Sequence, residues 1–169
     1  MNGPGRMLRV AVMAGAFALL AACGFKLRGE MVLPPELAKI SVQVADVYSP
    51  LQRNLEQALA RSGARAPRGE ERGAVLRISQ NRMTRWPLSV GRTGRVQEYS
   101  MRYEVTMQLI DADGAPVVPR QDIQLERTYQ FETLRAQGTP GEEEVVRAEL
   151  ERDMAQAILR RIDAVLAGR

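Results

Sequence analysis

Residues 99–109, with the sequence YSMRYEVTMQL, show the clearest structural pattern in the chain. Apolar or aromatic side chains occupy every second position, and polar or charged side chains lie between them. Successive side chains of a β-strand point to opposite faces, so this period of two predicts a strand with one apolar and one polar face. A sheet built around this strand needs a covering layer on its apolar face only.

The segment before residues 99–109 is predicted to pair with them as a hairpin. It forms a strand that starts at Ala74 and runs towards Trp86, where Pro87 should end or kink it because proline lacks a backbone N–H. Residues 91–94, GRTG, hold two glycines between the strands and are predicted to form the tip of the hairpin.

A further strand is predicted after the turn at Asp113-Gly114. Its apolar positions alternate, but Arg127 interrupts them. The alternating residues are Ile123, Leu125, Tyr129 and Phe131. We expect these aromatic side chains, with Tyr99 and Tyr103, to belong to a core beneath covering helices rather than to an acyl-chain pocket.

A short strand and a helix are predicted to precede the hairpin. The strand is indicated by Ile40, Val42 and Val44, which alternate with polar residues. Ser49-Pro50 supplies an N-cap and a proline at the first helical position, and Gly63 is placed to end the helix. The apolar face of this helix is formed by Leu51, Leu55, Ala58 and Leu59.

A long last helix is predicted to begin in Thr139-Pro140-Gly141-Glu142, which has the pattern of a capping box, and to end at Gly168. Glutamates at positions 142–144 suit the positive end of the helix dipole, an explanation we prefer to a metal site. The predicted apolar face consists of Val146, Leu150, Met154, Ala157, Ile158, Ile162 and Val165.

The predicted elements follow the order β-α-β-β-β-α. This order indicates an α+β fold: a two-layer sandwich with a four-stranded, largely antiparallel or mixed sheet and two helices on one face. We expect the fold to form a single domain over residues 38–169.

Residues 1–22 have the organisation of an export signal. Two arginines precede an uncharged apolar run from Val10 to Leu20, which is too short to span a bilayer. The run leads into Leu20-Ala21-Ala22-Cys23, the lipobox pattern of bacterial lipoproteins. We therefore predict a signal peptide over residues 1–22, N-acyl and S-diacylglycerol lipid on Cys23, and a tether over residues 23–37.

The residue after the lipidated cysteine indicates where the protein is sorted. It is Gly24 rather than the aspartate that retains enterobacterial lipoproteins in the inner membrane. We therefore expect a lipid anchor in the outer membrane, with the domain on the periplasmic side.

The composition excludes several classes of site. The chain contains no histidine, and Cys23 is its only cysteine, which removes disulfides, Cys/His zinc sites and histidine-based catalysis. Neither Ser41 nor Ser49 belongs to an SxxK motif. We expect no enzymatic activity, no metal and no cofactor beyond the covalent lipid. Export also removes nucleic acid as a partner.

Positive charge is concentrated in one part of the chain. The net charge is +4, or +2 without the two leader arginines, but residues 61–102 contain ten arginines against three glutamates. Arginine binds phosphate through a planar, two-pronged set of donors that lysine lacks. Charged residues at the end of a hairpin can also serve only to prevent edge pairing, and both interpretations stay open here.

Three motifs make the chain similar to a known family. They are ACGFKLRG at residues 22–29, SVGR at residues 89–92 leading to Glu98-Tyr99, and a strand followed by the long last helix. With the element order, they resemble the LptE family of lipopolysaccharide-assembly lipoproteins over essentially the whole chain from Cys23. The resemblance implies a non-enzymatic plug in the lumen of the outer-membrane β-barrel LptD, one copy of each, and a role for the pair in inserting lipopolysaccharide (LPS).

The resemblance also suggests residues that bind LPS phosphates. Arg92 falls where the family has a basic residue implicated in LPS binding, and Arg95 flanks the same tip. Arg85 and Arg82, further down the hairpin, complete the candidate set. A second basic position of the family, a lysine shortly before the last helix, has no match in residues 137–140, QGTP.

The main alternative is a lipoprotein scaffold of another envelope complex, for general barrel assembly or peptidoglycan attachment. The identity of the partner recovered after gentle detergent extraction distinguishes the two hypotheses.

Overall fold

The computed structural model describes residues 34–46, 48–92, 94–130 and 141–168. The predicted signal peptide, Cys23, Phe131 and the start of the predicted capping box lie outside these described residues. The elements in chain order are η1 (Pro35–Leu37), β1 (Ile40–Val44), α2 (Pro50–Arg61), β2 (Ala74–Val90), β3 (Val96–Ile110), β4 (Pro116–Gln130) and α3 (Glu142–Ala167).

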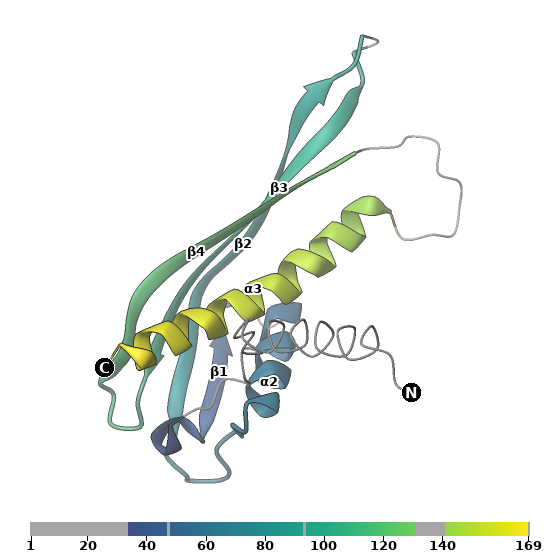
Figure 1. Ribbon diagram of the computed structural model, residues 1–169. Helices are drawn as coiled ribbons and strands as arrows, with labels where there is room; N and C mark the ends of the chain where they lie inside the picture. The colour runs from purple at the N-terminus through teal and green to yellow at the C-terminus, as the bar shows by residue number, and fades with distance from the viewer. Residues whose placement is uncertain (1–33, 47, 93, 131–140, 169) are drawn as a thin grey trace, which may run out of the picture. The chain divides into compact units, whose positions relative to one another are not determined.

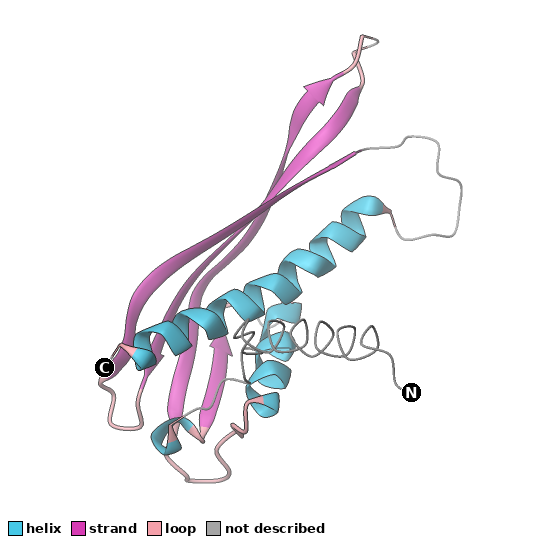
Figure 2. Ribbon diagram, viewed as in Figure 1, coloured by secondary structure: helices cyan, strands magenta, loops and turns pink. Residues whose placement is uncertain are grey.

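The strands form one mixed sheet in the order β1-β2-β3-β4. The first pair, β1 with β2, is parallel and is joined through α2, whereas β2, β3 and β4 pair as antiparallel neighbours. Figures 1 and 2 show both α-helices on the same side of the sheet. The predicted α+β sandwich, its element order and its mixed sheet are therefore confirmed.

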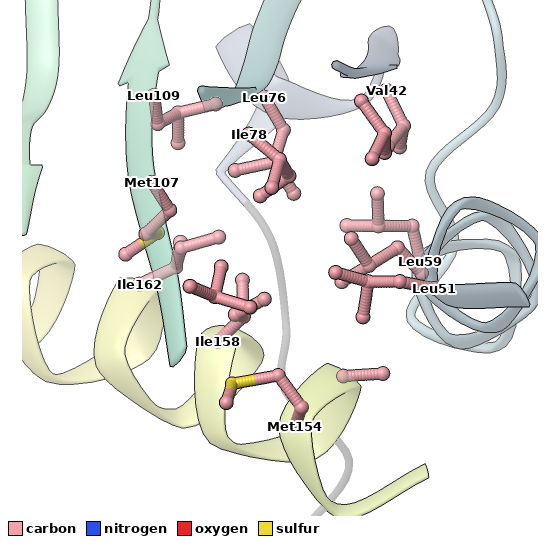
Figure 3. Close-up of a cluster of buried hydrophobic side chains, with 14 of the residues drawn as sticks. Val42, Leu51, Leu59, Leu76, Ile78, Met107, Leu109, Met154, Ile158 and Ile162 are labelled. Carbon is pink, nitrogen blue, oxygen red and sulfur yellow. The ribbon is translucent and has the colours of Figure 1, made fainter. Parts of the chain in front are cut away.

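The core lies between the helices and one face of the sheet. Alternate residues of β3 point into it, as their period of two predicts, and Met101, Tyr103 and Met107 are almost completely buried. Figure 3 shows Leu76, Ile78 and other strand side chains facing Met154, Ile158 and Ile162 of α3 and Leu51 and Leu59 of α2. Full burial of one such side chain contributes about 1.5–3 kcal/mol, so this layer carries most of the stability of the domain.

Helix α2 begins as predicted. The Ser49 side chain caps the helix by accepting a hydrogen bond from the Leu51 backbone N–H at 3.2 Å. It also accepts one from the Asn81 side-chain amide of β2 at 2.6 Å, which ties the start of the helix to the sheet. The helix ends at Arg61, and Gly63 reverses the chain with a φ of 84°, a conformation that glycine adopts without steric cost.

Helix α3 starts later than the predicted capping box. Its N-cap is Gly141, which makes no side-chain cap, and Glu142 is the first helical residue. The three glutamates of the first turn complement the helix dipole without a capping side chain. The buried face also differs slightly from the prediction, because Ala155 is buried whereas Ala157 and Val165 are only half-buried.

Strand β2 does not end at Pro87 but continues to Val90. The pairing with β3 shifts register between Pro87 and Ser89, where the irregular ladder tolerates a residue without an N–H. Strand β4 stops pairing with β3 at Glu98, so among the described residues only two strands continue beyond that point. We call residues 88–97 the arm and residues 91–95 its tip (Figure 1).

None of the described helices is both long enough and apolar enough to cross a membrane.

Candidate functional site

The tip carries two of the four predicted arginines. The Gly91 backbone N–H donates to the Arg95 carbonyl at 2.8 Å, and Gly94 turns the chain with a φ of 75°. Both arginines, Arg92 and Arg95, are exposed. Within the described part of the chain neither side chain has a carboxylate partner, so the tip presents two cations that no neighbouring acid neutralises.

The other two predicted arginines lie on opposite faces of β2. Residues three positions apart on a strand point to opposite sides, and Arg82 faces away from the helices while Arg85 faces towards them. Arg82 forms an ion pair with Glu104 across the ladder at 2.8 Å. The four candidate arginines therefore do not form one cluster, and only Arg92 and Arg95 lie together at the tip.

Arg85 belongs to a contact between the hairpin and the start of α3. Its guanidinium lies 4.5 Å from the centre of the Tyr99 ring and pairs with Glu143 of the first turn of α3. The Tyr99 ring stacks on Tyr129 of β4 with 5.8 Å between ring centres. Burial raises the pKa of Tyr129, which keeps the phenol neutral beneath the ion pair. We call Arg85, Tyr99, Tyr129 and Glu143 the upper clamp.

Arg127 of β4 makes a second contact between the sheet and α3, which we call the lower clamp. Its guanidinium donates to Glu149 at 2.9 Å and to Asp153 at 2.6 Å, two acids one turn apart on α3. This explains why a charged residue interrupts the apolar face of β4: it faces the helix at the rim of the core, where two carboxylates receive it. The sequence signal was the spacing of the two acids, and sequence analysis did not connect it with Arg127.

The sheet face away from the helices is polar. Arg102 pairs with Glu126 at 3.2 Å and covers the Trp86 ring at 4.8 Å from its centre. The Ser100 hydroxyl donates to Glu126 at 2.7 Å, and this hydrogen bond lowers the pKa of that carboxyl. The described residues place no helix over this face, which is therefore a hydrogen-bonded, mixed-charge surface (Figure 2).

No group of three potential ligands that could hold a metal ion occurs among the described residues. Of the glutamates at the start of α3, Glu143 pairs with Arg85 and, one turn on, with Arg147 at 3.5 Å.

Solved structures of other proteins share this fold. A lipoprotein B from Nitrosomonas europaea aligns with a TM-score of 0.70 and 27% identity, covering 85% of this chain and 93% of that one. The rare lipoprotein B from Shewanella oneidensis aligns with a TM-score of 0.65 and 22% identity, covering 77% and 97%. The fold is thus that of a class of small bacterial lipoproteins.

Sequence comparison defines the family within this class. The family model LptE, Lipopolysaccharide-assembly, matches residues 37–162. The LPS-assembly lipoprotein LptE of Yersinia enterocolitica is 32% identical over 154 residues, which cover 90% of this chain and 73% of that protein. Its counterpart in Pectobacterium atrosepticum is 28% identical, covering 89% and 82%. The chain belongs to the LptE family of lipopolysaccharide-assembly lipoproteins.

Proposed function

We propose that this protein is the lipid-anchored subunit of an outer-membrane LPS-assembly complex, in which it occupies the lumen of the LptD β-barrel in a 1:1 ratio. In this role it binds rather than catalyses: it supports the barrel, blocks its pore and contacts LPS as it passes. Membership of a family named for LPS assembly is the observation that carries the proposal.

The anchor in this proposal is the lipid on Cys23. Each buried acyl CH₂ contributes about 0.8 kcal/mol, so several chains hold a protein at a membrane almost irreversibly. The domain itself then needs no membrane-spanning element.

The polar sheet face supports the proposed position inside a barrel. The lumen of an outer-membrane barrel is polar, so a plug must offer hydrogen-bonding groups over a broad area. The face that carries Arg82, Arg102, Glu104 and Glu126 is such an area, with charges of both signs already paired along the surface.

The tip supports contact with LPS. The lipid A part of LPS carries phosphates. The exposed Arg92 and Arg95 have no competing carboxylate among the described residues. We propose these two residues as the phosphate-binding pair. Arg82 and Arg85 would first have to give up Glu104 and Glu143, so we assign them to holding the hairpin rather than to binding.

Purification of the complex tests the proposed partnership. The full chain, tagged at its C-terminus, is extracted from outer membranes in mild detergent, and the bound proteins are identified and quantified. We expect LptD in near-equal amount. A second envelope lipoprotein with the same tag serves as the control for non-specific recovery. Recovery of a barrel-assembly or peptidoglycan-linked complex instead of LptD would refute the proposal and favour the scaffold alternative.

A further inference from the structure

The outer edge of β1 has backbone hydrogen-bonding groups that no strand of the described residues pairs with. The Ala74 N–H donates to the Lys39 carbonyl and the Ala45 N–H to the Ile78 carbonyl. The backbone N–H and C=O groups of the odd-numbered residues in this segment therefore point towards β2. Even-numbered residues must point outward, and the Ile40 N–H does so. For Val42 and Val44, the described residues supply no strand on that side.

The chain itself begins a fifth strand at this edge. Arg65 forms an isolated parallel bridge with Lys39, in which the Arg65 N–H donates to the Ala38 carbonyl and the Ile40 N–H to the Arg65 carbonyl, both at 2.9 Å. Pro67 follows two residues later and has no N–H to continue the ladder. The edge is thus able to accept a strand, and among the described residues Arg65 occupies one end of it.

A hollow of about 220 Å³ lies beside this edge, between β1 and α2. Its floor is apolar and is formed by Ile40, Val42, Leu59 and Ala64. A water molecule occupies about 30 Å³, so the space is large enough for an apolar side chain. A strand added at the edge would direct every second side chain towards this hollow.

The rim of the hollow has one charge without an ionic partner. Both nearby cations, Arg65 and Lys39, pair with Glu71, at 2.7 and 3.6 Å. Across the hollow, Glu56 accepts a hydrogen bond from Gln52 at 2.9 Å but pairs with no cation among the described residues. The rim as a whole is neutral, but Glu56 is a carboxylate without an ionic partner among the described residues, which favours a basic residue placed directly opposite it.

The opposite edge of the sheet, β4, has a sequence that disfavours pairing. Strand β4 contains Pro116 and Pro119 and carries charged residues such as Arg120 and Asp122 along its length. Prolines and charges are the usual means by which proteins prevent pairing at an edge. We therefore infer that the β1 edge, which has an apolar hollow beside it, is the better site for an added strand among the described residues.

We propose that the β1 edge binds an extended segment of a partner protein as a fifth strand, with alternate apolar side chains in the hollow and a basic side chain opposite Glu56. In such strand addition, backbone hydrogen bonds supply affinity and the side-chain pocket supplies selectivity. This site lies on a different part of the domain from the tip and does not depend on which barrel the protein occupies.

Peptide binding to the full chain in detergent tests this site. The probe is the peptide acetyl-Thr-Val-Thr-Lys-Thr-Val-amide, in which the two valines and the lysine share one face and can point towards the hollow and Glu56 together. The control has the same sequence with methyl groups on alternate backbone nitrogens, which removes the ladder donors but keeps the side chains. We expect the probe to shift the NMR signals of the Val42 and Val44 amides and to slow their hydrogen exchange. The methylated peptide should bind at least about tenfold more weakly, because it lacks the N–H donors that form the ladder with β1.

Substitutions then test the hollow, as the methylated peptide tests the edge. Ala66→Trp, at the exposed mouth of the hollow, should abolish probe binding, whereas Ala112→Trp in the β3–β4 turn should not. Glu56→Lys should weaken binding several-fold, and Glu70→Lys, an exposed control of equal charge change, should leave it unaltered.

Three results with the probe would overturn the proposal, and a fourth concerns the protein alone. They are equal binding of the methylated peptide, NMR shifts confined to another surface, and no binding at millimolar probe. Concentration-dependent dimerisation that Ala66→Trp removes would also overturn it, since the occupant would then be a second copy of this chain.

Discussion

The two ends of the β2–β3 hairpin differ although the same two strands build both. At the base, Leu76 and Met107 are 0% exposed beneath the helices, whereas Leu88 and Val90 in the arm are 54% and 60% exposed. The base is covered on one face by α2 and α3, and the arm extends past the part of the sheet that they cover (Figure 1). Strand formation therefore needs only the partner strand, whereas stability needs the second layer.

This difference separates the contribution of a residue to stability from its accessibility to other molecules. A residue of the base contributes to the free energy of unfolding and is shielded from other molecules. A residue of the arm contributes little to unfolding and is free to contact them. Substitutions at the two ends should therefore have opposite effects on stability and on binding.

The largest effect is expected in the core of the base. Ile158→Ala removes a completely buried side chain that faces the sheet and should lower the free energy of unfolding by about 2–5 kcal/mol. Val90→Ala in the arm should change it by less than about 0.5 kcal/mol. Urea denaturation of the full chain, followed by circular dichroism, measures both. Similar losses for the two variants would contradict the contrast.

The next effect is expected at the tip. Reversing both charges with Arg92→Glu and Arg95→Glu should reduce LPS binding about tenfold to a hundredfold, because hydrogen bonds to charged groups are worth about 1.5–3 kcal/mol. The melting temperature should not change, since both residues are exposed. LPS bound to the purified protein is the quantity to measure.

The matched control reverses two charges on the exposed side of α3, with Arg160→Glu and Arg161→Glu. This variant has the same net charge as the tip variant. Equal loss of LPS in the two variants would mean that net charge, not the tip, governs binding.

A smaller effect is expected at the lower clamp. Arg127→Met keeps the apolar stem but removes the pairs with Glu149 and Asp153, and should cost about 1 kcal/mol of unfolding free energy. The loss should shrink in 1 M salt, which screens exposed pairs. Arg120→Met, on the same strand but without an acid partner among the described residues, is the control. A loss independent of salt would indicate packing rather than charge.

The smallest effect concerns acid stability near the base. Hydrogen bonds from Arg65 and from the Arg68 backbone lower the pKa of Glu71 to about 2. A lowered pKa in the folded state stabilises the protein above the ordinary carboxyl pKa, and this contribution is lost as the pH falls through about 2. Carboxyl NMR titration should find the low pKa and its return towards the ordinary value in Arg65→Met. A normal pKa in the unsubstituted chain would contradict the ion pair.

Much of the fold could be predicted because its signals are local. The alternation in residues 99–109, the Ser49-Pro50 start of α2 and the turn at Asp113-Gly114 each depend on a few neighbouring residues, and the structure contains all three. The predicted start of α3 was wrong, because a capping pattern competes with other ways to begin a helix. Here the first-turn glutamates and Gly141 suffice.

The arrangement of the arginines was less predictable, for a non-local reason. That Arg82 and Arg85 point to opposite faces follows from their spacing, but their acid partners come from β3 and α3, 22 and 58 residues away in sequence. Sequence alone gives charge and position along a strand. Only the packing of α3 against the sheet determines which charges are already neutralised and which, at the tip, are not.

The arm also has a consequence for how homologous proteins can change in reach. Each residue added to a strand lengthens it by about 3.4 Å and turns the following side chains to the other face. Inserting one residue in each strand would therefore present the tip arginines on the wrong side, whereas inserting two would restore them about 7 Å further out. Because the upper clamp holds the hairpin to α3 below the arm, such insertions leave the part of the hairpin beneath the helices unchanged. The arm is an adjustable spacer whose length evolution can alter only in steps of two.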